Sequence, residues 1–144
     1  MAFLRSIDIS ASALTAQRMR MDVIAENVAN INTTRTATGA PYRRRYVVME
    51  QKGKSFGSYL STAINSRSGD GVRVTQIMED TSPFKLDYNP QHPDADVNGY
   101  VRMPNVDMAT EMVDMMSATR SYEANLTVLN SLKNMAIKAL EIGQ

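Results

Sequence analysis

Cysteine and tryptophan are absent from this sequence of 144 residues, and histidine occurs once. Without cysteine the chain cannot form disulfide bonds or thiolate metal sites. No uncharged apolar run reaches the roughly 18 residues that a transmembrane helix requires. The N-terminus does not read as a secretory signal, because Asp8 stands where the apolar core of a signal would be. We expect no membrane insertion. If the protein leaves the cytoplasm, it does so uncleaved and by another route.

Motifs of enzymes and cofactor sites are equally scarce. The sequence contains no glycine-rich phosphate loop, nucleophile elbow or His-Glu-x-x-His zinc motif. The single histidine, His92, is followed by Asp94 and Asp96, and such a group could bind a divalent cation or act as a base. A histidine beside proline in a polar segment is more often a turn residue. We therefore predict no enzymatic activity, no cofactor and no metal.

Charge is nearly balanced over the whole chain but unevenly distributed along it. The formal net charge is +1, whereas general polyanion-binding domains are usually strongly basic. Residues 35–54 carry six basic side chains and one acidic one, and residues 79–114 carry eight acidic side chains and two basic ones. Opposed segments suit head-to-tail association with copies of the chain. The alternative is that both segments are solvated surfaces.

The basic segment contains Arg43, Arg44 and Arg45 between two tyrosines. Such a cluster could bind nucleic acid through phosphate contacts and stacking. It could equally face an acidic surface of a neighbouring subunit. Because the overall charge is close to neutral, we favour an electrostatic contact with a neighbouring subunit.

Apolar residues recur every seven positions at both ends of the chain, in residues 4–32 and 107–142. This spacing is typical of a seam along which one helix packs on another. We predict two long terminal helices, packed as an antiparallel coiled-coil-like pair. The apolar residues of both ends exceed what one helix pair can bury, which indicates further partners. The predicted assembly interface comprises Ile7, Leu14, Met21, Ile24, Val28, Met108, Met112, Met115, Tyr122, Leu126, Leu129 and Leu140.

The middle of the chain lacks the seven-residue apolar repeat and is rich in residues that favour strands and turns. Residues 42–49 and 71–80 favour strands, residues 53–70 are rich in turn formers, and Asn98-Gly99 is typical of a hairpin turn before another strand. The predicted fold is mainly α with a small inserted β-rich lobe. We divide it into an N-terminal helix over residues 1–33, a connector and central lobe over 34–104, and a C-terminal helix over 105–144.

Several stretches resemble the rod and hook proteins of the bacterial flagellum. The segment from Ser12 to Thr34 contains Asn27-Val28-Ala29-Asn30, which resembles the Asn-x-Ala-Asn signature of this family. Glu111-Met112-Val113 and Ser121-Tyr122-Glu123-Ala124-Asn125 resemble the matching C-terminal end. The proximal rod type is indicated by motifs between the two ends: Ser82-Pro83-Phe84, His92-Pro93-Asp94-Ala95-Asp96, Gly99-Tyr100-Val101 and Pro104-Asn105-Val106. The sequence departs from many relatives in placing Gly39 later after the signature than their Thr-x-Gly-aromatic motif does.

The resemblance implies a structural subunit of the proximal rod, the periplasmic drive shaft of the basal body, required for motility. Members are exported uncleaved by the flagellar type III apparatus and pack their terminal helices into helical layers. The implied partners are further copies, other proximal and distal rod proteins, the export-gate adaptor and the membrane-ring junction, with no nucleic acid. The implied signature residues are Asn27, Ala29, Asn30, Tyr122, Glu123 and Asn125. The alternative is a helical adaptor or a nucleic-acid-binding protein that uses Arg43, Arg44 and Arg45.

Overall fold

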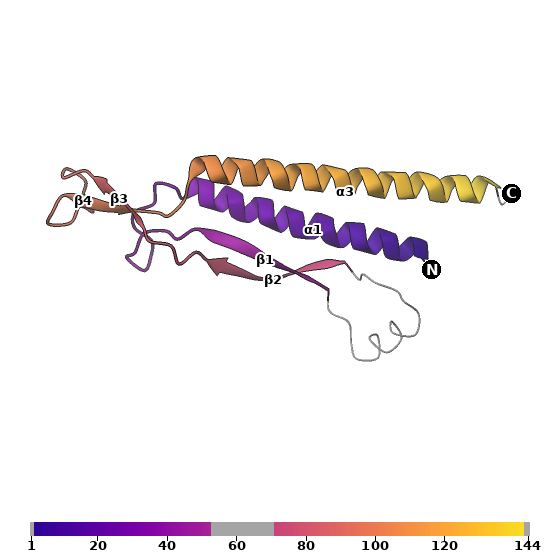
Figure 1. The fold of residues 1–144 in the computed structure, drawn as a ribbon, viewed down its shortest axis with the longest axis horizontal. Helices are drawn as coiled ribbons and strands as arrows, with labels where there is room; N and C mark the ends of the chain where they lie inside the picture. The colour runs from indigo at the N-terminus through magenta and orange to yellow at the C-terminus, as the bar shows by residue number, and fades with distance from the viewer. Residues whose placement is uncertain (1, 53–70, 143–144) are drawn as a thin grey trace.

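In the computed structural model the protein is elongated, and two long helices lie side by side over most of its length (Figure 1). The structure describes residues 2–52 and 71–142. The two helices run in opposite directions, so both termini lie at one end and a small β-rich region lies at the other. This arrangement confirms the predicted mainly α fold. The elements are α1 (Ala2–Ala29), β1 (Arg45–Gln51), β2 (Val72–Glu79), β3 (Lys85–Tyr88), β4 (Tyr100–Met103) and α3 (Met108–Ile142).

Both helices end close to the predicted residues. The α1 helix stops at Ala29, about three residues earlier than predicted, where Asn30 bonds the Glu26 carbonyl through its side chain at 2.9 Å. Asparagine side chains compete with the helical ladder in this way. The α3 helix begins after Asp107, whose carboxylate accepts hydrogen bonds from the amide and hydroxyl of Thr110 at 3.1 and 2.9 Å. Asp107 is therefore the N-cap, and these bonds hold the pKa of its carboxyl below the ordinary value.

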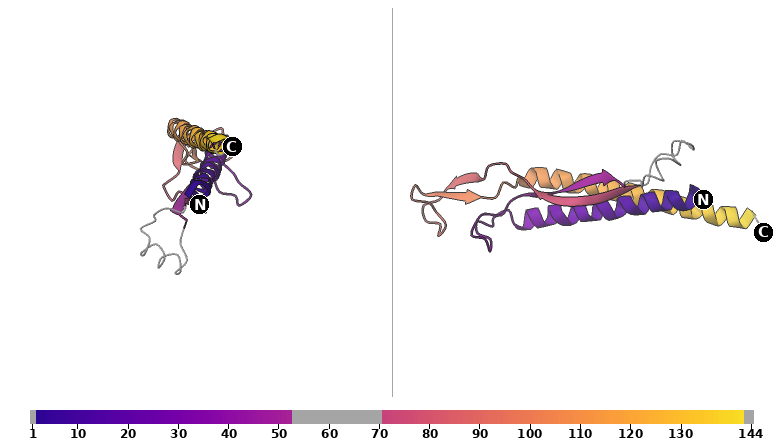
Figure 2. Two further views of the ribbon diagram at one scale, coloured as in Figure 1. Left: turned by 90° about the vertical axis from the view of Figure 1, so that its right-hand side faces the viewer. Right: turned by 90° about the horizontal axis from the view of Figure 1, so that it is seen from below.

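A two-stranded ribbon of β1 and β2 lies along α1 on the side away from α3 (Figure 2). Its strands pair antiparallel from Arg45 opposite Glu79 to Gln51 opposite Val72, with a bulge between Val48 and Met49. These are the two strands that the sequence predicts over 42–49 and 71–80. The turn-rich segment predicted between them lies outside the described residues. Because the ribbon contacts α1, the N-terminal helix is the middle layer of the molecule.

The second strand pair, β3 and β4, lies beyond the helices at the end opposite the termini. The predicted turn at Asn98-Gly99 is present directly before β4, where the Gly99 amide donates to the Asp96 carbonyl at 2.8 Å. It closes an eleven-residue connection over 89–99 rather than a two-residue hairpin. Gly99 has φ +78°, and its carbonyl accepts the Asn89 amide at 2.9 Å. Strand β3 was not predicted, since all four of its residues are exposed and proline-containing turns flank it.

The buried apolar core is small. Part of it lies where α1 meets α3 and the ribbon, and Val101 in β4 and Val106 before α3 add to it. Its α1 members include Val23 and Ile24, and its α3 member is Ala118, which is fully buried. Seven apolar residues are classed as buried in the described part of the chain, whereas nineteen large apolar residues are exposed. No helix in residues 2–52 or 71–142 is both long enough and apolar enough to cross a membrane. More large apolar side chains are therefore exposed than fully buried in the described part of the chain.

Candidate assembly surface and the polar junction behind it

A group of polar side chains, buried at its centre and partly exposed at its edge, lies where the end of α1, the start of β1 and the first turns of α3 meet. We call Arg20, Asn27, Tyr42, Arg44, Glu111 and Asp114 the polar junction. Asn27 is fully buried and makes all four hydrogen bonds that an asparagine side chain can make. It donates to the Arg45 carbonyl at 2.8 Å and to Glu111 at 3.0 Å, and it accepts from the Arg45 amide at 2.9 Å and the Tyr42 hydroxyl at 3.0 Å.

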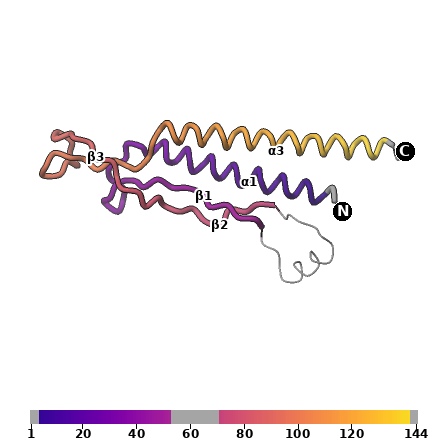
Figure 3. Tube along the Cα trace, viewed as in Figure 1, coloured from indigo at the N-terminus to yellow at the C-terminus, as the bar shows by residue number. Residues whose placement is uncertain are grey.

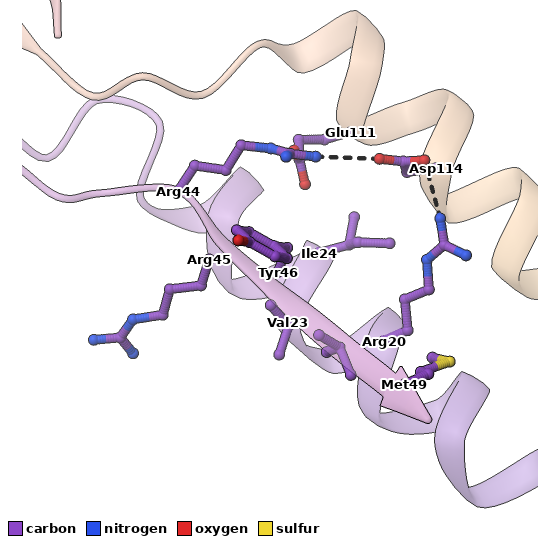
Figure 4. Close-up of a pocket in the computed structure, with 10 residues that line it drawn as sticks. Arg20, Val23, Ile24, Arg44, Arg45, Tyr46, Met49, Glu111 and Asp114 are labelled. Atoms are coloured by element: carbon purple, nitrogen blue, oxygen red, sulfur yellow. Dashed lines mark hydrogen bonds and ion pairs between the residues drawn. The ribbon is translucent and has the colours of Figure 1, made fainter. Parts of the chain in front are cut away.

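Glu111 is the largest fully buried side chain in the described residues, and Arg44 neutralises it. The Arg44 Nε donates to Glu111 at 2.5 Å, and its terminal nitrogen donates to Asp114 at 3.2 Å. Asp114 in turn accepts from Arg20 at 3.1 Å, so it bridges two arginines (Figure 4). Each charge in this chain of ion pairs has an opposite charge beside it, which is the condition under which buried charges are tolerated.

Two pKa values reflect this enclosure. Burial alone lowers the pKa of Arg44, but the hydrogen bond and charge of Glu111 outweigh that effect and raise it above the ordinary value. Burial, reinforced by the charge of Glu26, raises the pKa of Tyr42 to about 12. Arg44 therefore stays charged and Tyr42 stays a hydrogen-bond donor throughout the physiological pH range.

The three consecutive arginines have partners within the chain. Arg45 points away from the junction and pairs with Glu26 at 3.0 Å and Glu79 at 3.7 Å. Arg43 lies 4.4 Å above the ring of Phe84 and donates to the Asp80 carbonyl at 3.1 Å. The opposed charges that the sequence reveals thus attract one another within one subunit. Contact of Arg43, Arg44 and Arg45 with an acidic face of a neighbour stays a prediction.

The six signature residues do not gather in one place. Asn27 lies in the polar junction, Ala29 is exposed, and Asn30 ends α1 through its bond to Glu26. On α3, Tyr122 and Asn125 are half-buried and Glu123 is exposed. Asn125 donates to the Ser121 carbonyl at 2.8 Å within its own helix. Asn27 and Asn30 therefore have evident roles inside the subunit, in the polar junction and at the end of α1.

Sequence reasoning missed Glu111 as a junction residue and interpreted it as a charge favourable to the start of the helix. A signal was present, because Glu111 lies four and seven residues before Met115 and Ala118, on the same helical stripe. A charged residue on an apolar stripe indicates a buried partner. That partner, Arg44, lies 67 residues earlier, too far for any local pattern to reveal.

The predicted interface residues divide into two groups by exposure. Ile24 is buried, and seven others are half-buried: Ile7, Leu14, Met21, Val28, Met115, Tyr122 and Leu129. The remaining four are exposed: Met108 (38%), Met112 (58%), Leu126 (41%) and Leu140 (74%). The seven-residue seam is therefore only partly covered by the helix pair itself.

Further exposed apolar side chains accompany this second group along α3. Val113 and Met116 join Met108 and Met112 in the first turns, while Val128, Met135 and Ile137 lie further along. The α1 helix adds Leu4, Ile9 and Met19. The α3 helix is also the longer of the two and extends past the N-terminal end of α1 (Figure 3). We call these exposed apolar residues of α1 and α3 the helix surface.

The described residues do not bring together a group of side chains typical of a catalytic site. A hollow of about 430 Å³ opens between α1, β1 and α3, with Val23, Ile24 and Met49 beside the ion pairs of the polar junction (Figure 4). His92 lies elsewhere, in the loop after β3, where its Nδ1 accepts the Asp94 amide at 3.1 Å. No group of three or more His, Asp or Glu side chains in residues 2–52 and 71–142 is arranged to hold a metal ion.

Comparisons with known proteins all match flagellar basal-body rod proteins. Residues 7–35 match a family model described as flagella basal body rod protein, and residues 97–142 match one described as flagellar basal body rod FlgEFG protein C-terminal. The chain is 51% identical to the flagellar basal-body rod protein FlgC of Bacillus subtilis, with both chains covered completely. It is 46% identical to FlgC of Borreliella burgdorferi and 45% identical to FlgC of Escherichia coli O6:H1, with at least 99% of each chain covered.

Proposed function

The chain belongs to the FlgC-type family of flagellar basal-body rod proteins, and on this premise we propose that it joins the rod through the helix surface. It is a structural subunit of the basal-body rod and assembles with other rod proteins. The observation that carries the proposal is the amount of exposed apolar surface on α1 and α3. Exposed patches of this kind on a soluble chain mark interaction sites.

Burial of the helix surface would contribute favourable free energy to assembly. Burying one Met, Leu or Val side chain contributes roughly 1.5–3 kcal/mol. Four exposed residues in the first turns of α3 alone (Met108, Met112, Val113 and Met116) would then contribute several kcal/mol before the entropic cost of association. Methionine is flexible and suits surfaces that meet more than one kind of neighbour. This fits a subunit that contacts both copies of itself and other rod proteins.

Finer features of the function also belong to this proposal. We place the protein in the periplasmic proximal rod, exported by the flagellar type III apparatus, with the export-gate adaptor and membrane-ring junction among its neighbours. A non-enzymatic role fits the lack of converging catalytic groups in the described residues. The alternative of nucleic-acid binding has no support, because Arg44 and Arg45 already pair with carboxylates of the chain.

A charge placed on the helix surface tests the proposal. Met116→Asp puts a carboxylate at a position that is 53% exposed in the subunit, so the fold should be unaffected. Burial of that charge against a neighbour would cost several kcal/mol. We expect normal synthesis and export, loss of incorporation into isolated basal bodies, and cells that do not swim. Thr127→Asp, which adds the same charge at an exposed polar position of α3, is the matched control and should swim. Wild-type swimming of the Met116 variant would refute the proposal.

A further inference from the structure

The apolar residues of the helix pair do not by themselves define one register of α1 against α3. Met108, Met115, Tyr122 and Leu129 follow one another at intervals of seven on α3, and Leu14, Met21 and Val28 do the same on α1. A slide of one helix past the other by seven residues, about 10.5 Å, therefore places apolar residues against apolar residues again. The seams favour pairing of the helices but discriminate poorly between registers.

The polar junction has no such repeat. In the observed register Asn27 of α1 bonds Glu111 of α3, and both side chains are fully buried. Sliding α3 by seven residues in one direction brings Asn27 level with Ala118, and a slide in either direction separates Asn27 from Glu111. The slipped pair would leave buried polar groups without partners, and each such group costs about 1–3 kcal/mol, more when charged.

We propose that Asn27, Glu111 and Arg44 determine the register of α1 against α3 rather than adding net stability. Replacing a buried ion pair by well-packed apolar residues is often neutral or stabilising, whereas a single buried polar residue can specify the alignment of a helix pair. Arg44 extends this control beyond the helices, because it directly precedes β1 and its own amide donates to Asn105 at 2.8 Å. The same three residues therefore align the ribbon with the helix pair. This inference concerns a single chain and goes beyond the proposed rod function.

The absence of cysteine makes the register directly measurable. Met21→Cys with Thr119→Cys reports the observed register, since the Thr119 hydroxyl lies 3.6 Å from the Met21 sulfur. Met21→Cys with Leu126→Cys reports a slip of seven residues. Each pair is introduced into the full chain, which is treated at high dilution with a short bismaleimide. Intrachain cross-links are then counted by mass spectrometry, with helix content followed by circular dichroism.

In the otherwise unchanged chain only the first pair should cross-link efficiently. Combining Asn27→Leu, Glu111→Leu and Arg44→Met removes the Asn27 partner of the Tyr42 hydroxyl and the Arg45 backbone, so the unfolding midpoint should fall. Below that midpoint the triple variant should preserve helix content and raise cross-linking of the slipped pair by about tenfold or more. The matched control is Glu26→Leu with Arg45→Met, which removes an ion pair that is 3.0 Å long but exposed. This control should keep the observed register.

Four results would overturn the inference. The triple variant could retain only the observed register, or the control could slip as much as the triple variant does. Loss of helix content in the triple variant would mean that the junction supplies stability itself. Equal cross-linking of both pairs, or of neither, in the chain with an intact junction would show that no single register exists there. None of these results bears on whether the protein is a rod subunit.

Discussion

At the scale of single residues, the polar junction shows how one side chain can join three segments. Asn27 contacts the backbone of Arg45, the hydroxyl of Tyr42 and the carboxylate of Glu111, and it has no hydrogen-bonding capacity left over. Replacement of one partner leaves the others buried without a bond. Single substitutions here should therefore be far more damaging than simultaneous apolar replacement of the group.

Arg44→Gln should destabilise the subunit strongly. It leaves Glu111 fully buried without its cation, and breaking a buried pair in this way costs about 3–5 kcal/mol. We expect a loss of roughly 2–4 kcal/mol, because the Arg44 side chain retains 23% exposure. Urea unfolding followed by circular dichroism measures the change.

Arg43→Gln is the control for this substitution. Its guanidinium contacts the Phe84 ring and a backbone carbonyl without facing a buried carboxylate. We expect a cost of about 1 kcal/mol, as for a single cation–π contact or hydrogen bond. Equal unfolding midpoints for the two variants would contradict this account of Arg44.

Tyr42 should make stability depend on alkaline pH. Burial raises the pKa of its hydroxyl from 10.0 to about 12 in the folded chain. The neutral form is favoured by folding, so its contribution is fully present below pH 10 and is lost as pH rises toward 12. We expect a loss of about 2 kcal/mol across this interval.

The measurement compares urea unfolding of the unchanged chain and of Tyr42→Phe at pH 9.5 and 11.5. Phenylalanine does not ionise, and the Asn27 oxygen still accepts the Arg45 amide in that variant. The free energy of unfolding of the unchanged chain should fall more steeply than that of the variant. Parallel pH dependences would show that Tyr42 ionises as freely in the folded chain as in the unfolded one.

At the scale of the elements, α1 is the common support of the molecule. It contacts α3 on one side and the β1–β2 ribbon on the other. The ribbon is tied to α1 at both ends, by Arg45 at Asn27 and by the Val72 amide, which donates to the Ser12 hydroxyl at 3.1 Å. A two-stranded ribbon is marginal on its own, so these ties to α1 hold it in place.

Gly71→Ala should loosen the second of these ties. Gly71 has φ +90°, a conformation that side chains disfavour, and a methyl group there would collide with the Ser12 hydroxyl. We expect a loss of about 1–3 kcal/mol in the free energy of unfolding. Gly39→Ala is the control, since φ is +79° there but space is open. Its cost should be about 1 kcal/mol. If both variants lose the same amount, the contact with Ser12 contributes nothing.

At the scale of the whole molecule, the subunit is a well-packed junction with long, sparsely covered helices extending from it. The fully buried residues Asn27, Glu111 and Ala118 lie near one end of the helix pair. At the opposite end, α3 extends past α1 and exposes Met135, Ile137 and Leu140. Local stability follows the density of such contacts.

Amide hydrogen exchange on the free monomer should therefore show a gradient. We expect the strongest protection in residues 20–29 and 110–119, and progressively weaker protection toward residue 142, where the helix lacks a neighbour. In isolated basal bodies, contacts with other subunits should protect the same distal residues. Uniform protection along α3 in a verified monomer would contradict this description.

The sequence alone determines most elements of this protein and the family to which it belongs. Apolar repeats of seven residues and the β-favouring stretches are local patterns, and local patterns suffice to specify two long helices around a small β-rich region. The excess of apolar residues over what a helix pair can bury likewise indicates assembly. Strand β3 and the length of its connection to β4 escaped prediction because pairing with β4, not local preference, stabilises the strand.

Only the tertiary structure decided which charges meet and which faces are covered. Arg44 reads as part of an exposed basic cluster, yet it pairs with Glu111 across 67 residues of chain. The predicted interface residues are likewise indistinguishable in the sequence, although Ile24 is buried and Met112 is 58% exposed. Both outcomes depend on how α1, β1 and α3 are placed around one another. That placement is a property of contacts distant in sequence, which no local pattern encodes.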